Sequence, residues 1–202
     1  MGTNGRLGDA EVIAASLIEP GRFGLIVEAY TAPISRYLAR RVGAVLAEDL
    51  TSETFLQAFR RRCTYRADQP SALPWVYGIA TNQVRAHFRT EQRQLEALGQ
   101  LAGQAALDTT GNQNVDDALL AAAAVQHLAG AFASLSGEAR DVLALVGVEG
   151  LNYEDAAAAL GVKVGTVRSR LSRARQELRR SLAEEHPRLR AGAAPSEGTC
   201  HG

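Results

Sequence analysis

Cysteine is nearly absent from this chain, since Cys63 and Cys200 are the only two among its 202 residues. They lie far apart and no CxxC spacing occurs, which argues against a disulfide framework and against a structural zinc site. Aromatic residues make up only 5%, and isoleucine and phenylalanine are few beside alanine and arginine. Because alanine and arginine favour helices over strands, the composition predicts an all-α protein.

Long apolar runs are missing as well. The longest, "ALLAAAAV", is far too short to span a bilayer, and the opening "MGTNGRLGDAEVIAAS" lacks the basic start and apolar core of a signal peptide. His186, Cys200 and His201 fall in a segment with the composition of a disordered tail, so no metal site is expected there. We therefore expect a soluble, cytoplasmic protein with no membrane insertion, no metal and no cofactor.

The net charge of zero conceals three blocks of different sign. Residues 1–93 carry 12 basic and 9 acidic side chains, residues 94–162 carry 1 and 9, and residues 163–202 carry 9 and 4. Two basic segments around an acidic one indicate two surfaces that face a polyanion, separated by a middle that avoids it. Three solvated faces with accidental clustering are the alternative.

The distribution of aromatic residues and glycines divides the chain into two small helical domains joined by a flexible linker. Most aromatic residues lie in the first half, whereas the stretch that follows it is small, polar and rich in glycine. The expected boundaries are 21–93 for an N-terminal domain, 94–114 for the linker, 115–185 for a C-terminal domain and 186–202 for a disordered tail. The helices expected in the first domain are 22–42, 47–62 and 71–93. In the second domain, one helix is expected after a cap at Asn114 or Asp116, and another after Ser136, which is a good N-cap.

The segment "NYEDAAAALGVKVGTVRSRL" has the pattern of a helix-turn-helix. A short helix, Tyr153–Leu160, runs into Gly161, and a second helix begins near Val164. Ala157, four residues before the glycine, is small enough for the two helices to cross closely. The apolar side chains that would lock them together are Val162, Val167 and Leu171. In such a unit the second helix enters the major groove of DNA, although helix hairpins in other helical proteins share the pattern.

The second helix of this unit is rich in arginine and amphipathic. Val167, Leu171 and Ala174 fall on one stripe at helical spacing, which predicts that this stripe faces the domain core. The opposite arc carries side chains that can read base edges or contact phosphates. The residues that we predict to bind DNA here are Lys163, Thr166, Arg168, Ser169, Arg170, Ser172, Arg173 and Gln176. A basic solvated face is the alternative.

A second basic stripe lies on the helix expected at 71–93. We predict that Asn82, Arg85, Arg89 and Arg93 share one face, opposite a core face. That core face consists of Leu73, Val76, Tyr77, Ala80, Val84 and Phe88. In the preceding loop "CTYRADQP", Tyr65 and Arg66 combine an aromatic ring with a cation, which suits an unpaired base that stacks and is hydrogen-bonded. Tyr65 is alternatively a lid on the domain core.

Together these pieces resemble a known family. The order "EDLTSETF", "WVYGIATN", "HFR", "LSGEARDVLALVGVEGLNYEDAAAALG" and "VGTVRSRLSRARQELR" is similar to the bacterial RNA polymerase sigma factors of the extracytoplasmic-function (ECF) group. The resemblance runs from about Phe23 to Leu182, and the helix-turn-helix is its most specific part. It implies an alternative sigma factor, which is not an enzyme, because the polymerase does the chemistry.

The resemblance also implies partners and site residues. The N-terminal domain would bind the β′ clamp helices of the RNA polymerase core through Glu48, Asp49, Leu50, Glu53 and Phe55. The loop bearing Tyr65 and Arg66, with the stripe of Asn82, Arg85, Arg89 and Arg93, would read the minus-ten element of promoter DNA. The helix-turn-helix would bind the minus-thirty-five element and touch the β flap. An anti-sigma factor is a further expected partner.

The chain departs from the family pattern at a few positions. Ser52 and Ala86 stand where the family usually has Gln and Asp, and Lys163 stands where it often has a Ser that caps the helix. Lys163 either loses that cap, at about 1 kcal/mol, or approaches a phosphate at the positive end of the helix. The alternative function is an autonomous helix-turn-helix repressor or response regulator that binds a palindrome as a dimer. A helical enzyme ranks third, because no nucleophile–base pair is visible.

Overall fold

The computed structural model of the chain describes residues 8–101, 130–132 and 134–185. Every regular element in these ranges is a helix, which confirms the predicted all-α class. The helix expected after Asp116, most of the predicted linker and the predicted tail lie outside the described residues. In chain order the elements are α1 Asp9–Ser16, η1 Pro20–Phe23, α2 Gly24–Val42, α3 Ala44–Arg60, η2 Arg62–Thr64, α4 Leu73–Leu101, α6 Gly137–Val142, η3 Leu143–Val148, α7 Tyr153–Leu160 and α8 Val164–Glu185.

The N-terminal domain consists of α1 to α4, with α2, α3 and α4 packed on one another. Within its core, the buried Tyr37 hydroxyl and Thr81 Oγ1 share a hydrogen bond of 2.8 Å. Tyr37 also meets Tyr77 edge-on, with ring centroids 5.3 Å apart. Two expected boundaries were wrong. Helix α3 begins three residues before 47, and α4 continues eight residues into the predicted linker.

Helix α1 was not expected from the sequence. Its Val12 and Ile13 are buried in a second apolar cluster with Phe23, Ile26 and Ile79. Its first residue, Asp9, accepts a 2.6 Å hydrogen bond from the backbone N–H of Ala72, one residue before α4 begins. Asp9 also accepts from the hydroxyl of Tyr30, which lies 3.1 Å from Ser71 Oγ. Helix α1 therefore satisfies a free N–H at the start of α4, as a helix cap does.

In the C-terminal domain, the cap of α6 and the turn after α7 lie where the sequence predicts. Ser136 Oγ accepts from the N–H of Ala139 at 3.2 Å and caps α6. Element η3 is a short π-helix, and just after it the N–H of Glu149 donates to the carbonyl of Ala144 at 2.9 Å. Helix α7 is capped by Asn152 and ends at Gly161, whose φ of +65° is the left-handed conformation that favours glycine. Helix α8 then packs on both α6 and α7.

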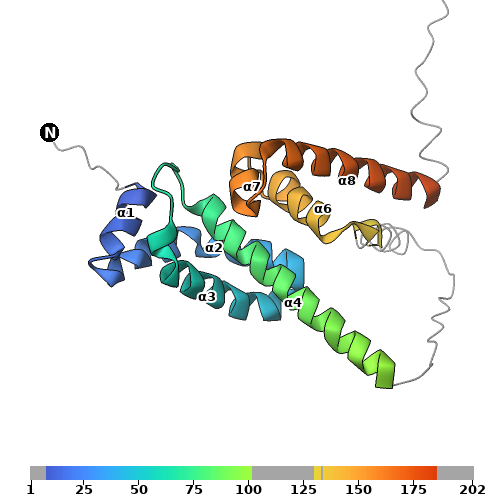
Figure 1. Cartoon of the computed structure of the whole chain (residues 1–202), viewed down its shortest axis with the longest axis horizontal. Coiled ribbons are helices and arrows are strands. Elements are labelled where there is room, and N and C mark those ends of the chain that lie inside the picture. Colours follow the sequence, from blue (N-terminus) through green and yellow to red (C-terminus); the bar gives the residue numbers. More distant parts are fainter. Residues whose placement is uncertain (1–7, 102–129, 133, 186–202) are drawn as a thin grey trace, which may run out of the picture.

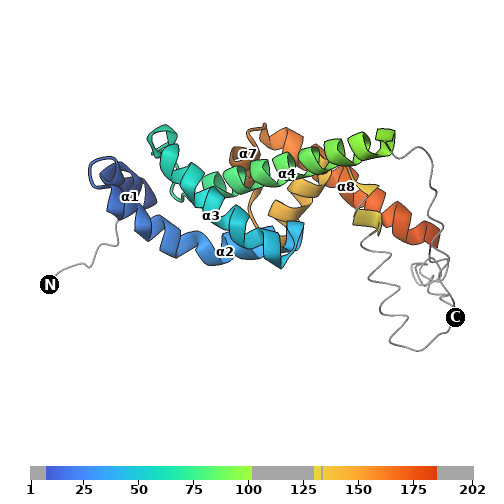
Figure 2. The same ribbon diagram turned by 90° about the horizontal axis from the view of Figure 1, so that it is seen from below.

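The two domains pack directly on each other. Helix α7 lies beside the first half of α4, and the second half of α4 extends beyond the bundle (Figure 1, Figure 2). One continuous cluster of buried residues runs from Ile34 and Tyr37 of the N-terminal domain to Leu171 and Ala174 of the C-terminal domain. The two domains, which the sequence places at either end of a linker, are therefore in direct contact in a closed arrangement.

Candidate nucleic-acid interface

Helix α8 has one buried face and one exposed face, as its sequence predicts. Val167 and Ala174 are fully buried and Leu171 is 2% exposed. Six of the eight predicted contact residues are exposed on the other side, and Thr166 is half-buried. The exposed six are Lys163, Arg168, Ser169, Ser172, Arg173 and Gln176. Since the αL turn at Gly161 fixes how α8 leaves α7, this face is presented on a rigid base.

Contacts within the unit hold several of these side chains. Ser169 Oγ donates to the carbonyl of Thr166 at 3.1 Å, and Arg173 Nε donates to the carbonyl of Ser169 at 3.4 Å. The guanidinium of Arg168 lies 5.6 Å from the ring centre of Tyr153 in α7, a cation–π contact. Exposed hydroxyls and cations on one helical face form a surface suited to DNA.

Arg170 differs from its neighbours. Its side chain is only 19% exposed and forms a 2.5 Å ion pair with Glu138 of α6. In this arrangement Arg170 holds α8 against α6 and does not project with the exposed face. Sequence reasoning placed Arg170 among the contact residues because helical spacing gives no sign of Glu138, which lies 32 positions earlier in the chain.

Lys163 immediately precedes α8. Its carbonyl accepts from the N–H of Thr166 at 2.8 Å and from the N–H of Val167 at 3.2 Å. Its side chain is exposed. The lysine therefore stands at the positive end of the α8 dipole, where an anion is favoured.

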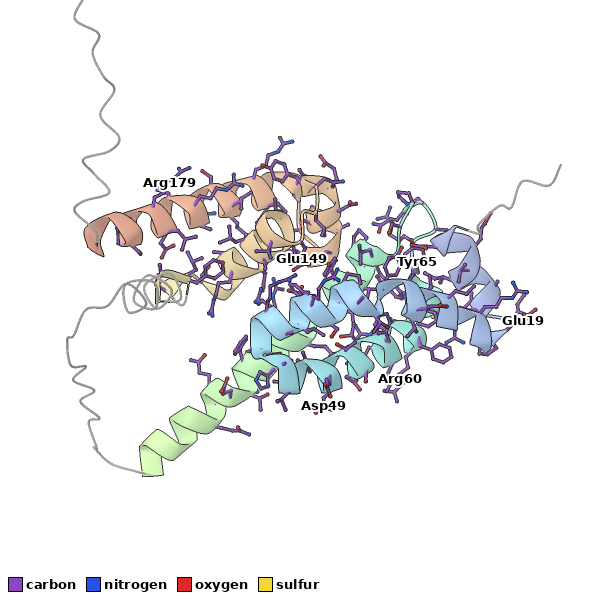
Figure 3. The ribbon with its side chains drawn as sticks, turned by 180° about the vertical axis from the view of Figure 1, so that it is seen from behind. Glu19, Asp49, Arg60, Tyr65, Glu149 and Arg179 are labelled. Carbon is purple, nitrogen blue, oxygen red and sulfur yellow. The ribbon has the colours of Figure 1, made fainter. Side chains whose placement is uncertain are left out.

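Two side-chain contacts hold Tyr65 in place in the loop before α4. The ring packs edge-on against Trp75, with centroids 5.2 Å apart, and the hydroxyl donates to the carbonyl of Gln69 at 3.1 Å. Arg66 is exposed and pairs with Asp68 at 2.7 Å. Figure 3 shows Tyr65 at the end of the molecule where α1 meets this loop. Tyr65 thus partly covers the second apolar cluster and keeps one side exposed.

Tyr65 is expected to stay protonated in the folded protein well beyond its ordinary range. Burial, followed by the nearby carboxylate of Asp9, raises the pKa of Tyr65 to about 12. The ordinary pKa of a tyrosine is about 10. The protonated Tyr65 hydroxyl therefore contributes fully to the free energy of unfolding below pH about 10, and this contribution is lost as the pH rises towards about 12. The test subtracts the tyrosinate absorbance titration of Tyr65→Phe from that of the parent chain. A difference curve with its midpoint at the ordinary value would contradict the expected burial.

The predicted stripe on α4 is divided between solvent and the C-terminal domain. Asn82, Arg89 and Arg93 are exposed. Arg85 is not free, because its Nε forms a 2.6 Å ion pair with Asp141 of α6. The core face of α4 was correct for Val76, Tyr77, Ala80 and Val84, and Leu73 is half-buried. It was wrong for Phe88, which is 37% exposed because α4 outruns the helices that cover it.

The acidic end of α3 is a separate surface. Glu48 and Asp49 are exposed, as Figure 3 shows for Asp49, and Leu50 is half-buried against the core. Glu53 accepts from Gln57 at 3.1 Å, and Phe55 is 7% exposed, so Phe55 packs in the core.

Sequence reasoning missed two residues of this surface, Val45 and Leu56, which are 89% and 42% exposed. With Ser52 they lie at helical spacing on one face, a signal that was available.

The described part of the chain has neither a cluster of metal ligands nor a membrane-spanning helix. Its side chains bring no three potential metal ligands together. None of its helices is both long enough and apolar enough to cross a membrane. The candidate surfaces are thus the exposed faces of α8, α4 and α3.

Comparison with known proteins identifies both halves of the chain. The model of Sigma-70 region 2 matches residues 26–94, and the model of Sigma-70, region 4 matches residues 127–178. The first match contains most of α2, all of α3 and most of α4, and the second contains α6, η3, α7 and the greater part of α8.

Several curated relatives agree with these matches. The chain is 41% identical over 141 residues to the ECF RNA polymerase sigma factor SigE of Mycolicibacterium smegmatis. The aligned residues cover 68% of this chain and 52% of the relative. It is 30% identical to BldN of Streptomyces coelicolor, with 83% of this chain and 62% of the relative covered. It is 36% identical to EcfG of Rhodopseudomonas palustris, with 65% and 68% covered. The chain thus spans about half of SigE and about three fifths of BldN.

Two solved structures share the fold. The sigma factor RpoE, in complex with the anti-sigma factor NepR from Bartonella quintana, has a TM-score of 0.58 at 23% identity, over 82% of this chain and 99% of that one. CnrH, in complex with the cytosolic domain of CnrY, has a TM-score of 0.60 at 23% identity, over 88% and 99%. Given the two family matches and the identity to EcfG over two thirds of its length, the chain belongs to the ECF group of sigma-70 factors.

Proposed function

We propose that this chain is an alternative sigma factor, which binds core RNA polymerase and directs initiation at specific promoters. The observation that carries the proposal is the exposed face of α8, held by a helix-turn-helix in the same chain as a region 2 domain. An autonomous repressor needs the helix-turn-helix alone, whereas a sigma factor needs both domains. In this proposal the chain contacts DNA and polymerase, and the polymerase carries out the chemistry. The chain would therefore act in the cytoplasm, where the polymerase transcribes.

The α8 face would read the minus-thirty-five element. Arg168 and Arg173 are exposed and have the reach for base edges in the major groove, and Ser169, Ser172 and Gln176 offer shorter polar contacts. A well-placed arginine on guanine provides about 1–3 kcal/mol of discrimination. Lys163 and Thr166, at the start of the helix, would contact backbone phosphates.

The loop that bears Tyr65 and Arg66, together with the exposed part of the α4 stripe, would read the minus-ten element once the two DNA strands have separated. Asn82, Arg89 and Arg93 are exposed on one side of α4, and the half-covered ring of Tyr65 lies near the start of the same helix beside Arg66. Aromatic stacking on an unpaired base contributes about 1–3 kcal/mol. Arg85 would join this set only when its pair with Asp141 opens.

The polymerase would meet the acidic face of α3. Glu48 and Asp49 supply negative charge, and the exposed Val45 and Leu56 beside them supply apolar contact. An apolar patch rimmed by charges is typical of a protein interface. Leu50 and Phe55 would act from inside the domain, by holding α3 in place. An anti-sigma factor is a further proposed partner. RpoE was solved in complex with the anti-sigma factor NepR, and CnrH in complex with the cytosolic domain of CnrY.

The decisive experiment is run-off transcription from genomic fragments with purified bacterial core polymerase. We expect transcripts from a subset of fragments only when the chain is added, and none from core polymerase by itself. Loss of these transcripts on reversing the charges of Glu48 and Asp49 to lysine would link them to the α3 face. If the chain binds a palindromic fragment tightly as a dimer and starts no transcription, it is an autonomous repressor and the proposal is wrong.

A further inference from the structure

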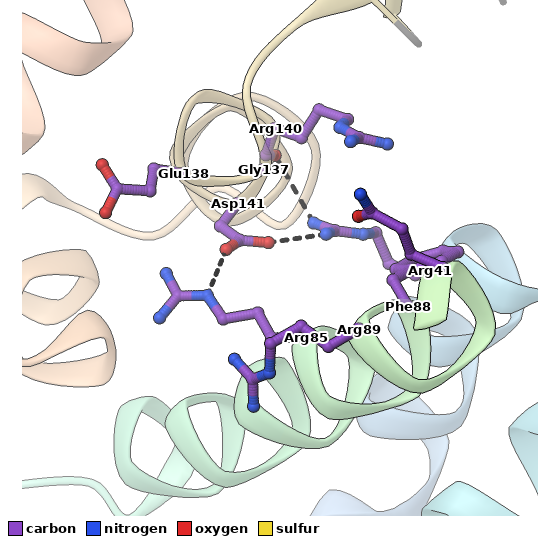
Figure 4. A pocket seen from close by; sticks show the side chains of 9 residues that line it. Arg41, Arg85, Phe88, Arg89, Gly137, Glu138, Arg140 and Asp141 are labelled. Carbon is purple, nitrogen blue, oxygen red and sulfur yellow. Dashed lines mark hydrogen bonds and ion pairs between the residues drawn. The ribbon is translucent and has the colours of Figure 1, made fainter. Parts of the chain in front are cut away.

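Two carboxylates of this protein join helices that lie far apart in the sequence. Asp141 joins the two domains through its ion pairs with Arg41 and Arg85 (Figure 4). Asp9 of α1 acts within the N-terminal domain, where it binds the backbone of Ala72 at the end of the loop before α4. This second contact links a helix outside the region 2 match to the loop that the proposed function assigns to the minus-ten element.

The loop 65–72 is exposed in its middle and fixed at its two ends. Residues 66–68 are exposed, and the turn that they form is closed by the N–H of Gln69, which donates to the carbonyl of Arg66 at 3.2 Å. At the start of the loop, Tyr65 is half-buried. At its end, Ala72 is fully buried. The path of the exposed middle is therefore set by what holds the two ends.

The end of the loop is also the start of α4, and the capping residue there is an alanine. The carbonyl of Ala72 accepts the first hydrogen bond of the helix, from the N–H of Val76 at 3.0 Å. Alanine has no side-chain acceptor and is a poor N-cap. In a capping box, an acidic residue of the first turn accepts from the N–H of the capping residue. Here Asp9 does so from 63 positions away, at 2.6 Å, and its charge suits the positive end of the α4 dipole.

A tyrosine of α2 fixes the carboxylate and the loop together. The hydroxyl of Tyr30 donates to Asp9 and lies 3.1 Å from Ser71 Oγ. A hydroxyl has a single hydrogen to donate, so Ser71 donates to Tyr30 and itself accepts from the N–H of Leu73 at 3.2 Å. Burial and the bond to Asp9 raise the pKa of Tyr30, so its hydroxyl keeps the proton. Asp9, Tyr30, Ser71 and Ala72 thus form one hydrogen-bonded group, the Asp9 network.

Helix α1 also supports the other end of the loop. Val12 and Ile13 are buried in the cluster against which Tyr65 and Trp75 pack. Asp9 lies close enough to Tyr65 to contribute, after burial, to its raised pKa. Both ends of the loop 65–72 therefore rest on α1, and Figure 3 shows Tyr65 at this junction.

We propose that Asp9 is a positioning residue for base recognition: it fixes the conformation of the loop 65–72, and this conformation decides which base of the minus-ten element is accepted. The inference rests on the proposed function, because it assigns a base-reading role to the same loop. A recognition site selects its ligand when its groups are held within about 0.5 Å of their places. Hydrogen bonds that the wrong base leaves unmade then carry the discrimination. Asp9 acts through the loop, so its loss would weaken selectivity more than it weakens transcription.

The first measurement uses the full-length chain, core polymerase and a genomic fragment that the parent transcribes. The minus-ten and minus-thirty-five elements of this fragment are randomised in turn, and sequencing of the transcripts gives the base preference at each position. Asp9→Ala removes the acceptor, Asp9→Asn keeps an oxygen in its place, and Tyr30→Phe removes the hydroxyl and keeps the ring. Glu11→Ala is the matched control, since Glu11 accepts from the N–H of Gly8 at 3.0 Å and caps the same helix at its own start.

We expect Asp9→Ala to lower the base preference at one or two minus-ten positions by about tenfold, as for the loss of one hydrogen bond to a base. The preference in the minus-thirty-five element should stay unchanged, because α8 reads it. Tyr30→Phe should affect the same positions by a smaller factor, whereas Asp9→Asn and Glu11→Ala should keep the parental preference. An unchanged minus-ten preference in both Asp9→Ala and Tyr30→Phe, or an equal loss in Glu11→Ala, would overturn the positioning role.

The second measurement needs neither polymerase nor DNA. Trp75 is the only tryptophan of the chain, so acrylamide quenching of its fluorescence reports how well the loop covers it. The quenching constant should rise in Asp9→Ala and stay at the parental value in Glu11→Ala. Circular dichroism identifies a variant that has unfolded, and Tyr30→Phe then decides alone.

The two measurements separate failure of the inference from failure of the proposed function. If the parent starts no transcription, the proposed function is wrong and the base-reading role falls with it, while the quenching result still shows whether Asp9 holds the loop. If the parent transcribes and Asp9→Ala keeps the parental preference together with Tyr30→Phe, only the positioning role is wrong.

Discussion

Replacing Leu171 with alanine is expected to lower the free energy of unfolding by about 2–5 kcal/mol and to abolish promoter binding with it. Leu171 is 2% exposed and lies in the same buried cluster as Val142 and Leu145 of the C-terminal domain. Alanine removes the side-chain atoms that fix α8 against this core and leaves a cavity. The free energy of unfolding then falls by the transfer free energy of the removed atoms and, in addition, by the cost of the cavity. Without that base, α8 no longer presents its polar face in one orientation.

Urea unfolding followed by circular dichroism measures the stability change, and a fluorescence anisotropy titration with a promoter fragment measures binding. Leu178→Ala is the matched control, since Leu178 of the same helix packs against the same cluster but is only half-buried. It should cost distinctly less stability. A change in unfolding free energy below about 1 kcal/mol for Leu171→Ala would show that the cluster does not hold α8.

Replacing both Arg168 and Arg173 with alanine is expected to weaken DNA binding while leaving the free energy of unfolding almost unchanged. Both side chains are exposed, so stability should change by no more than about 0.5 kcal/mol. Affinity for the minus-thirty-five element should fall by at least about tenfold for each arginine that reads a base, since 1.4 kcal/mol corresponds to a factor of ten. The change would appear in the rate of initiation as well as in binding.

The salt dependence of binding separates base contacts from phosphate contacts. Loss of a phosphate contact reduces the slope of log affinity against log salt by about one and weakens all sequences alike. Loss of a base contact relaxes specificity at one position. Arg60→Ala, which removes an exposed arginine of α3, is the control for net charge. Unchanged affinity in the double variant would remove α8 from the proposed interface.

The local parts of the fold were predictable because their chemistry is local. The turn between α7 and α8 requires a residue in the left-handed conformation, and Gly161 supplies it. The start of α6 requires a hydrogen-bond acceptor for a free backbone N–H, and Ser136 supplies that. The buried stripe of α8 follows from helical spacing alone. These features each depend on residues within four positions of one another, which is the range that periodicity and capping describe.

The residue pairs that hold the two domains together were not predictable from such patterns. Asp141 meets Arg41 and Arg85 across 100 and 56 positions of sequence, and nothing in the spacing of single charges selects these partners. The same limit explains why Arg170 and Arg85 were grouped with free arginines: their neighbours come from another helix. Phe88 was assigned to the core because α4 continues with helical spacing past the point where its partners end.

Helix α1 has a practical consequence for dissecting the molecule. The region 2 match begins at residue 26, which would suggest cutting the chain there to isolate a minimal region 2 domain. That cut would strip Val12, Ile13 and Phe23 from the cluster that buries Ile79, and would leave the N–H of Ala72 without its acceptor. The autonomous folding unit is therefore larger than the segment by which homology detects it. A truncated fragment that melts early would reflect where it was cut and not the intrinsic weakness of the domain.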